Sequence, residues 1–265
     1  MSKLIMEIVK QLRQAKDNLS TKTLFVFLVG VPIRRLKLKS NKEKIQKLTS
    51  LNDRFSLIYS LNVWGSKESV SGSGSTLAMT ESIRALLPSV FEKFGVKTIF
   101  DAPCGDFNWM KLINLQNLKY LGGDIVEPLI NDLQEKYTSK SISFVQIDIT
   151  KTIFPKSDLV LNRDCLFHLS YRDILLTLSN FLTSESKYFL STSHDNDGRF
   201  RNKDISSGDF RLIDLFAEPF NFPINFHFEI PEPGEGSLPS RKLYLWDREQ
   251  VRVAHSSLNR FLSNV

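Results

Sequence analysis

The stretch Lys97–Trp109, which reads KTIFDAPCGDFNW, decides the fold. Its apolar start, Lys97–Phe100, predicts a short strand that ends at Asp101. The turn that follows predicts a close approach of the backbone to a ligand, because Gly105 has no side chain in the way. Residues Asn108–Leu115 predict a helix after this turn. A strand, a tight turn and a helix form the first unit of a parallel α/β sheet.

The alternation of strand and helix continues along the chain. An amphipathic helix is expected at Thr80–Phe94, ended by Gly95 and interrupted by Pro88. Further strands are expected at Lys119–Gly123, Ser143–Ile147, Asp158–Leu161 and Lys187–Ser191. Further helices are expected at Pro128–Lys136 and Tyr171–Leu182. Strands separated by helices in this way require right-handed crossovers and a parallel sheet.

The last third of the chain changes character. A Pro- and Gly-rich segment joins two strand-like stretches, Ile224–Ile230 and Lys242–Trp246, which predict an antiparallel pair at the sheet edge. The predicted fold class is therefore α/β, a doubly wound sheet of five parallel strands plus a C-terminal antiparallel pair.

The composition is that of an ordinary globular protein. The 265 residues are 42% hydrophobic and 24% charged and include 2 cysteines, which excludes the disordered and disulfide-stapled classes. The longest apolar run, Thr23–Ile33, is shorter than the roughly 20 residues that cross a bilayer. Because we recognise no signal peptide, we expect a soluble, cytoplasmic protein with reduced thiols.

Positive charge is concentrated near the N-terminus. Residues 1–50 hold 12 of the 35 Lys and Arg but only 3 of the 29 Asp and Glu, so the remaining residues are mildly acidic. We expect a basic helical extension over 1–50 and one α/β domain over 51–265. Such an arm is typical of a solvated extension, and it also suits contact with an anionic membrane surface or with nucleic acid.

Polar and ionisable side chains follow each of the five predicted parallel strands. Asp101, Asp124 and Asp148 end the first three, Asn-Arg-Asp-Cys at 162–165 ends the fourth, and Ser-Thr-Ser-His at 191–194 ends the fifth. Open parallel sheets bind their ligands at these carboxyl ends. Asp124 follows Asp101 at about the spacing at which nucleoside-binding sheets place the acid that accepts hydrogen bonds from ribose hydroxyls.

The sequence Asp101-x-Pro-Cys-Gly-Asp followed by Trp109 resembles the first motif of class I S-adenosylmethionine-dependent methyltransferases, with Pro103 in place of the first glycine of the usual pattern. The resemblance covers roughly residues 64–246. The strings WGSKESVSGSGS, DAPCGDFNWM, RDCLFHLS and EPFNFP also resemble an uncharacterised subgroup, some of whose members are associated with surface-glycan biosynthesis. This resemblance implies a Rossmann-like fold and S-adenosyl-L-methionine as the cofactor.

The resemblance also implies roles by position. Asp101 and Gly105 would lie against the methionine end of the cofactor, Asp124 against the ribose and Asp148 against the adenine amino group. Facing the reacting centre would be Asn162 and Arg163. The expected cofactor-binding set is completed by Pro103, Cys104, Trp109, Ile125 and Ile149. Three aromatic side chains are candidates for stacking on adenine or a sugar, namely Trp64, Phe107 and Trp109.

Methyl transfer to a hydroxyl needs a base, and three residues near the strand ends are candidates. Histidine suits this role near neutral pH, and His168 and His194 follow the fourth and fifth strands. His168 also suits a structural role at the start of the next helix. Asp164 is the third candidate, as base or substrate ligand, although an acid beside Arg163 is typically a salt-bridge partner. No metal site is expected, because Cys104 and Cys165 lack two further ligands.

The predicted function is transfer of a methyl group, in line, to a hydroxyl-bearing small molecule or glycan. A nucleic acid acceptor is not favoured, because Asn-Arg-Asp-Cys replaces the Pro-Pro-aromatic motif of enzymes that methylate base amino groups. Polar residues within His194–Arg211, among them Asn202 and Asp204, suit a lid or acceptor loop. The alternatives are a non-catalytic nucleoside-binding module and an NAD(P)-linked oxidoreductase. Asp106 disfavours the latter, because its charge would repel a phosphate but suits a sulfonium.

Overall fold

The computed structural model describes residues 40–64, 66–234 and 236–264. Residues 48–265 form one compact unit, and every element named below belongs to it. In the unit that precedes it, the described residues 40–46 are helical. The rest of the expected basic arm, residues 1–39, lies outside the described residues. Over the described part of the chain, we find no helix with the length and apolar character needed to span a membrane.

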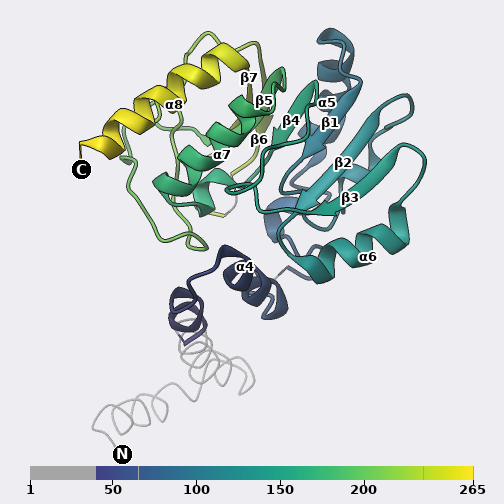
Figure 1. The fold of residues 1–265 in the computed structure, drawn as a ribbon, viewed down its shortest axis with the longest axis horizontal. Helices are drawn as coiled ribbons and strands as arrows, with labels where there is room; N and C mark the ends of the chain where they lie inside the picture. The colour runs from purple at the N-terminus through teal and green to yellow at the C-terminus, as the bar shows by residue number, and fades with distance from the viewer. Residues whose placement is uncertain (1–39, 65, 235, 265) are drawn as a thin grey trace, which may run out of the picture. The chain divides into compact units, whose positions relative to one another are not determined.

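The core of the molecule is a seven-stranded sheet (Figure 1). Its order is β3-β2-β1-β4-β5-β7-β6; the first five strands are parallel, and β7 is antiparallel to both β5 and β6. The bounds are β1 Thr98–Asp101, β2 Lys119–Asp124, β3 Ile142–Gln146, β4 Leu159–Asn162, β5 Tyr188–His194, β6 Phe228–Glu232 and β7 Arg241–Asp247. The structure therefore confirms the predicted fold class, with five parallel strands and a C-terminal antiparallel pair at the edge.

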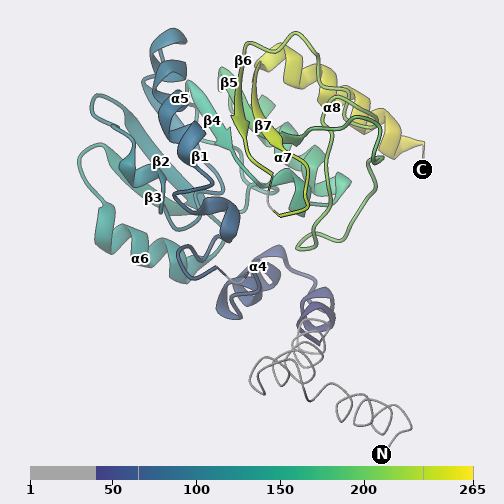
Figure 2. The ribbon, with the colours of Figure 1, turned by 180° about the vertical axis from the view of Figure 1, so that it is seen from behind.

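Helices cover both faces of the sheet (Figures 1 and 2). Helices α5 (Glu81–Lys93) and α6 (Glu127–Tyr137) contribute to one apolar core, and α7 (Tyr171–Thr183) and α8 (Arg248–Ser263) contribute to the other. Neighbouring strand residues alternate between the two cores, as Ile99 and Phe100 do in β1. The order of the parallel strands brings the carboxyl ends of β1, β2 and β4 together at one edge.

The connection from β1 to β2 differs from the prediction. The expected helix Asn108–Leu115 is wrong: the only helical residues between the two strands are the short 3-10 helix η3, Met110–Leu112. Ile113 already has extended backbone angles, and Met110 and Ile113 are both buried in the core. The chain therefore reaches β2 without an α-helix.

Two helices, the end of β5 and the start of β6 also differ from the prediction. Helix α4 (Leu51–Ser60) and helix α8 were not expected. Strand β5 continues to His194 because it pairs with β7 along its whole length, so His194 is the last residue of the strand and does not follow it. Strand β6 begins at Phe228, later than expected, where pairing with Leu245 begins.

Candidate functional site

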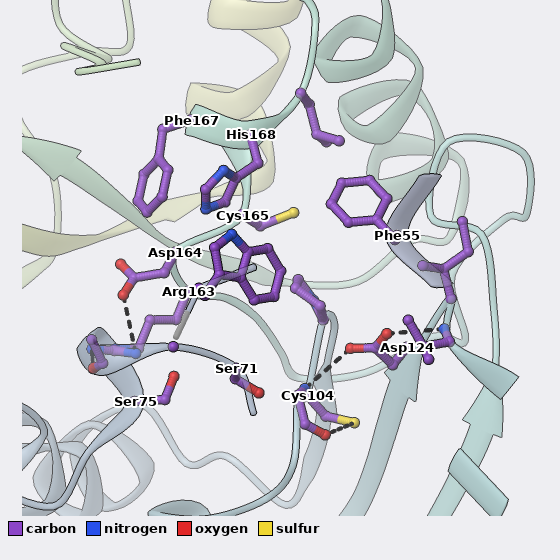
Figure 3. A pocket seen from close by; sticks show the side chains of 18 of the residues that line it. Phe55, Ser71, Ser75, Cys104, Asp124, Arg163, Asp164, Cys165, Phe167 and His168 are labelled. Atoms are coloured by element: carbon purple, nitrogen blue, oxygen red, sulfur yellow. Dashed lines mark hydrogen bonds and ion pairs between the residues drawn. The ribbon is translucent and has the colours of Figure 1, made fainter. Parts of the chain in front are cut away.

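A cavity of about 360 Å³ lies at the carboxyl ends of the parallel strands (Figure 3). Thirteen of the fourteen residues expected from the sequence line it; the exception is Asn162. Asn162 is fully buried, and its side-chain amide donates a hydrogen bond of 2.6 Å to the carbonyl oxygen of Ala102. Asn162 therefore joins the ends of β4 and β1 beneath the cavity. The expected residues that line the cavity are Asp101, Pro103, Cys104, Gly105, Trp109, Asp124, Ile125, Asp148, Ile149, Arg163, Asp164, His168 and His194.

Asp101 is a buried carboxylate at the end of β1. The hydroxyl of Tyr120 donates to its Oδ2 over 2.6 Å. Burial raises the pKa of Asp101 to about 7, although the Tyr120 hydrogen bond opposes this shift. With its pKa raised in this way, Asp101 would be shifted toward its ionised form by a positively charged ligand nearby.

Asp124, at the end of β2, holds the turn that follows β1. Its Oδ2 accepts from the backbone N–H of Gly105 over 3.2 Å, and its Oδ1 accepts from the N–H of Val126 over 3.1 Å. Burial raises its pKa to about 6, against the lowering effect of these hydrogen bonds. Each carboxylate oxygen can accept a further hydrogen bond, so Asp124 retains capacity for two ligand hydroxyls.

Gly105 is required at its position by both backbone and space. Its φ is +55°, and a Cβ built there would lie 2.3 Å from the Ser71 hydroxyl. That hydroxyl accepts a 3.0 Å hydrogen bond from the N–H of Asp106. The turn after β1 and the loop around Ser71 therefore pack without space for a side chain between them.

Asp148 follows β3, and its two carboxylate oxygens differ in the hydrogen bonds that they accept. Its Oδ1 accepts from the N–H and the hydroxyl of Thr150 over 3.0 and 2.7 Å. Its Oδ2 is buried and accepts no hydrogen bond from the described residues, although the Lys151 ammonium lies 3.2 Å away. A buried carboxylate oxygen on a cavity wall that accepts no hydrogen bond suits a donor group of a ligand.

Two segments contribute to the wall although the sequence analysis assigned them no role in the site. Leu51, Phe55 and Tyr59 of α4 line the cavity and share one face of that helix. Residues 70–75 of the Ser/Gly loop also line it. The i, i+4, i+8 spacing in α4 was a signal that could have been read, whereas the loop carries no such periodicity.

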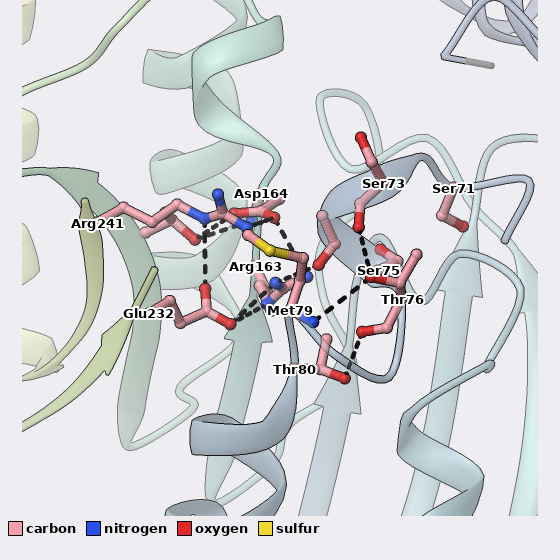
Figure 4. A network of polar contacts seen from close by, with 12 residues as sticks. Ser71, Ser73, Ser75, Thr76, Met79, Thr80, Arg163, Asp164, Glu232 and Arg241 are labelled. Carbon is pink, nitrogen blue, oxygen red and sulfur yellow. Dashed lines mark hydrogen bonds and ion pairs between the residues drawn. The ribbon is translucent and has the colours of Figure 1, made fainter. Parts of the chain in front are cut away.

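A network of two arginines and two carboxylates lies beside the loop (Figure 4). Arg163 is fully engaged: its Nε lies 2.9 Å from Glu232 Oε1, its Nη2 donates to the carbonyl of Gly74 over 2.7 Å, and its Nη1 lies 3.2 Å from Asp164 Oδ2. Arg241 Nη2 also donates to Asp164 Oδ2, over 3.0 Å. The network connects the loop to the ends of β4, β6 and β7.

Asp164 is an ion-pair partner within this network. Burial acts to raise its pKa, but Arg163 and Arg241 outweigh burial and hold the pKa below its ordinary value. Its Oδ1 also accepts from the Thr192 hydroxyl over 3.1 Å. A carboxylate held in this way is a weak proton acceptor, which disfavours it as the base.

The two histidines of the cavity have opposite tautomers. His168 Nδ1 lies 2.8 Å from the carbonyl oxygen of Asp209, which can only accept, so Nδ1 carries the proton and Nε2 of the neutral ring is free to accept one. His194 Nδ1 instead accepts from the N–H of Ile213 over 3.2 Å, so its neutral ring carries the proton on Nε2. Burial lowers the pKa of both rings, that of His194 to about 4. His168 thus has the tautomer of a base and His194 that of a hydrogen-bond donor.

Aromatic rings form a connected wall at the far end of the cavity from Asp124 (Figure 3). The centroid of His168 lies 5.5 Å from Trp64 and 4.6 Å from Phe167, and Phe167 lies 5.5 Å from Phe210. Of the three residues expected to stack on a ligand, Trp64 and Trp109 line the cavity. Phe107 does not; it packs in the core against Tyr120, Tyr137 and Phe144.

The polar residues of the segment after β5 mostly hold the fold. Arg211 is buried and donates to the carbonyls of Leu169 and Leu166. Asp204 accepts from the N–H of Tyr171, and Asn202 donates to the carbonyls of Asp214 and Glu218. These contacts anchor the segment, and the side chain that it adds to the cavity after His194 is Phe210.

The two cysteines are free, buried and part of the cavity wall. Burial raises the pKa of Cys165 to about 12 and that of Cys104 well above its ordinary value, so both stay protonated. Within the described residues, no three His, Cys, Asp or Glu side chains gather to hold a metal ion.

Comparison with known proteins identifies the fold but no close relative. No family model and no curated protein matches the chain. A solved structure of 1,6-didemethyltoxoflavin-N1-methyltransferase from Burkholderia thailandensis, with bound S-adenosylhomocysteine, is similar at a TM-score of 0.53 and 14% identity over 76% of this chain and 91% of that one. The mitomycin 7-O-methyltransferase MmcR is similar at a TM-score of 0.52 and 15% identity over 78% of this chain and 60% of that one. The chain thus has the fold of S-adenosylmethionine-dependent methyltransferases, and this fold occurs with both N- and O-methylation.

Proposed function

We propose that this chain is an S-adenosylmethionine-dependent methyltransferase that acts on a hydroxyl group of a small molecule or glycan. The observation that carries the proposal is that Asp101, Asp124 and Asp148, from the ends of three neighbouring strands, line one cavity. Three carboxylates on one wall suit a ligand that presents a cationic amino group, ribose hydroxyls and an adenine amino group in a row.

The donor set of the cavity fits this cofactor. Asp101 is placed to hold the ammonium group, Asp124 the ribose hydroxyls and Asp148 the adenine amino group, whose N–H would satisfy the open Oδ2. Ile125 and Ile149 provide apolar wall on either side of the adenine position. When bound, S-adenosylmethionine supplies an activated methyl group, and the protein supplies alignment.

The β1–β2 connection argues against a dinucleotide. Rossmann dehydrogenases bind the pyrophosphate at the N-terminus of the helix that follows β1. Here η3 is a single short turn, and the carboxylate of Asp106 accepts backbone hydrogen bonds near the cavity wall, from Val70 over 2.9 Å and from Asn108 over 3.3 Å. A negative group and a missing helix N-terminus both disfavour a phosphate at this position.

His168 supports a hydroxyl acceptor. Its free Nε2 would accept the proton of an acceptor hydroxyl, while Nδ1–H keeps its hydrogen bond to the Asp209 carbonyl. The imidazolium that results is stabilised by the negative charge of Asp164. An oxygen nucleophile needs this proton removed, which is why the base-type tautomer favours O-methylation.

Calorimetry with the full chain tests the proposal. We expect S-adenosylmethionine and S-adenosylhomocysteine to bind and NADH not to bind. Binding of NADH without binding of either adenosyl ligand would overturn it. A screen with tritiated methyl donor against nucleotide sugars, glycans and small phenols then identifies the acceptor, and cofactor binding without transfer to any fraction would favour the non-catalytic alternative.

A further inference from the structure

Arg241 has donor groups that the protein leaves unused. Its side chain is 6% exposed and lines the cavity. Nη2 binds Asp164, but Nε lies 3.4 Å from Glu232 Oε2 without forming a hydrogen bond. Among the described residues, the hydrogen bonds and ion pairs of the Arg241 guanidinium involve Nη2 and Nε and leave Nη1 without a partner. Nε is buried against Glu232, so Nη1 is the donor of Arg241 that remains for a ligand in the cavity.

His194 presents a second donor next to Arg241. The two residues are register partners on the antiparallel strands β5 and β7, so their side chains lie on the same face of the sheet. Both line the cavity. Because Nδ1 of His194 is occupied by the N–H of Ile213, its ring directs a proton from Nε2. Two neighbouring donors on a cavity wall suit an oxyanion.

The acids near Arg241 are already neutralised. Asp164 Oδ2 is shared by Arg163 and Arg241, and Glu232 is paired with Arg163 and does not line the cavity. Glu232 also lies 3.4 Å from Arg241 Nε, and both arginines oppose the effect of burial, which raises its pKa. Phe167 also lines the cavity, and its ring centroid lies 5.2 Å from that of His194.

These donors lie away from the wall that suits the cofactor. In the sheet order, β5 is two strands from β1, and β7 is three. At about 4.8 Å per strand, the backbones of β5 and β7 are roughly 10 to 14 Å from that of β1, although the Arg241 guanidinium reaches back to Asp164 at the end of β4. The methionine carboxylate of the cofactor, which would lie near Asp101, is therefore a poorer partner for them than a group on the acceptor.

We propose that Arg241 and His194 form an anion subsite, so that the methyl acceptor carries a carboxylate or phosphate group next to an apolar or aromatic portion. This inference rests on the proposed function, because it assigns the subsite to the acceptor. It predicts that an acidic acceptor is preferred over its neutral analogue of the same shape.

Benzoate and benzamide are matched probes, since they share a ring and differ in charge. Binding is measured by calorimetry on the full chain, with and without S-adenosylhomocysteine. We expect benzoate to bind at least about tenfold more tightly than benzamide, the effect of a charged hydrogen-bonded pair. Phenyl phosphate measured alongside distinguishes a phosphate from a carboxylate preference.

Variants assign this preference to the two donors. R241Q and H194F should each reduce the ratio of benzoate to benzamide affinity below about threefold. H194Q retains a donor near the position of Nε2 and should preserve this ratio. K242Q, the neighbouring residue on β7 with its ammonium paired to Glu229, is the control and should preserve it as well. If R241Q does not fold, R241K keeps the charge beside Asp164 and should still lose the preference, because its single ammonium is taken by that acid.

The outcomes are separable. Equal affinity for the two probes in the unchanged protein, or no benzoate binding at all, overturns the subsite. A tenfold loss of S-adenosylhomocysteine affinity in R241Q with the benzoate preference intact also overturns it, because the donors would then serve the cofactor. Failure of S-adenosylhomocysteine to bind overturns the proposed function. The preference for benzoate over benzamide is also measured in the cofactor-free protein, and there it tests the subsite independently of cofactor binding.

Discussion

The hydroxyl of Tyr120 donates a 2.6 Å hydrogen bond to Asp101 across two adjacent strands, and both groups are buried. This bond partly compensates the desolvation of the carboxylate but does not remove it, since burial still raises the pKa of Asp101 to about 7. In the folded protein, Asp101 therefore ionises less readily than a free aspartate, and a cation bound in the cavity would favour its ionised form.

Stability of the cofactor-free protein should fall as this acid ionises. The pKa in the folded state, about 7, lies above the ordinary value of 3.8, so the folded chain binds the proton more tightly. The contribution of Asp101 is complete below pH 4 and is lost as the pH rises through 7. Asp101→Asn should be more stable than the unchanged protein at pH 8, by about 4 kcal/mol, and equally stable at pH 4. Urea unfolding at both values measures this, and a less stable variant at pH 8 contradicts it.

Asp124→Ala should lose cofactor affinity. Removal of a carboxylate that accepts two ribose hydroxyls predicts a rise in the Kd of S-adenosylhomocysteine of about 100-fold. The control is Asp132→Ala on α6, whose carboxylate is 48% exposed and pairs with Lys136. Calorimetry that finds the same Kd for Asp124→Ala and the control would show that Asp124 does not bind the ribose.

Comparison of Gly105→Ala with Gly95→Ala distinguishes the effect of a side chain in the tight space at Gly105 from the effect of its positive backbone angle. Gly105 and Gly95 both have a φ near +60°, but only at Gly105 does an added Cβ meet another group, the Ser71 hydroxyl. Each substitution should cost about 1 kcal/mol of stability from backbone strain. Only Gly105→Ala should also weaken S-adenosylhomocysteine binding, by about tenfold, because the turn must shift. Unchanged affinity would mean that the turn does not approach the cofactor.

His168→Asn should slow transfer once an acceptor is known. Asparagine can still donate to the Asp209 carbonyl from the place of Nδ1, but it has no Nε2 to take the proton. We expect kcat to fall by about 100-fold or more at an unchanged Kd for the cofactor. His227→Asn at the exposed sheet edge is the control. In the unchanged enzyme the rate should decline as pH falls through a pKa below 6.5, because burial lowers the pKa of His168; a flat profile argues against a histidine base.

Glu232→Ala should be strongly destabilising. It leaves the buried Arg163 without one of its two carboxylate partners, a loss of about 3 kcal/mol or more. Glu229→Ala removes a carboxylate from the same strand, but this one is 40% exposed and pairs with Lys242, so it should cost under about 1 kcal/mol. Urea unfolding of the two variants compares them directly, and equal losses would mean that the network contributes no stability.

The sheet could be predicted because its signals are local. Each parallel strand is a short apolar run that ends at a polar residue, and Asp101, Asp124 and Asp148 marked those ends. Helix α7 carried a readable start, since the Ser170 side chain accepts from the N–H of Asp173. The same kind of signal marks α8, where Asp247 and Gln250 form a capping box that the sequence analysis overlooked.

Other features depend on contacts between distant residues and could not be read from the sequence. The segment Asn108–Leu115 has helix-like apolar spacing, but its chain leaves the helical conformation at Ile113 while Met110 and Ile113 are both buried in the core. Asn162 looked like a cavity residue because it ends a strand, yet its amide turns to the Ala102 carbonyl. The opposite tautomers of His168 and His194 follow from backbone groups at Asp209 and Ile213, which fold back from beyond β5.

The cavity wall runs from Leu51 in the first helix of the domain to Arg241 in its last strand. A nascent or partly unfolded chain therefore cannot form the pocket, and the chain can bind a ligand there only when the whole domain has folded. Since a ligand that binds only the native state raises the free energy of unfolding, occupancy should protect residues at both extremes of the domain from proteolysis together.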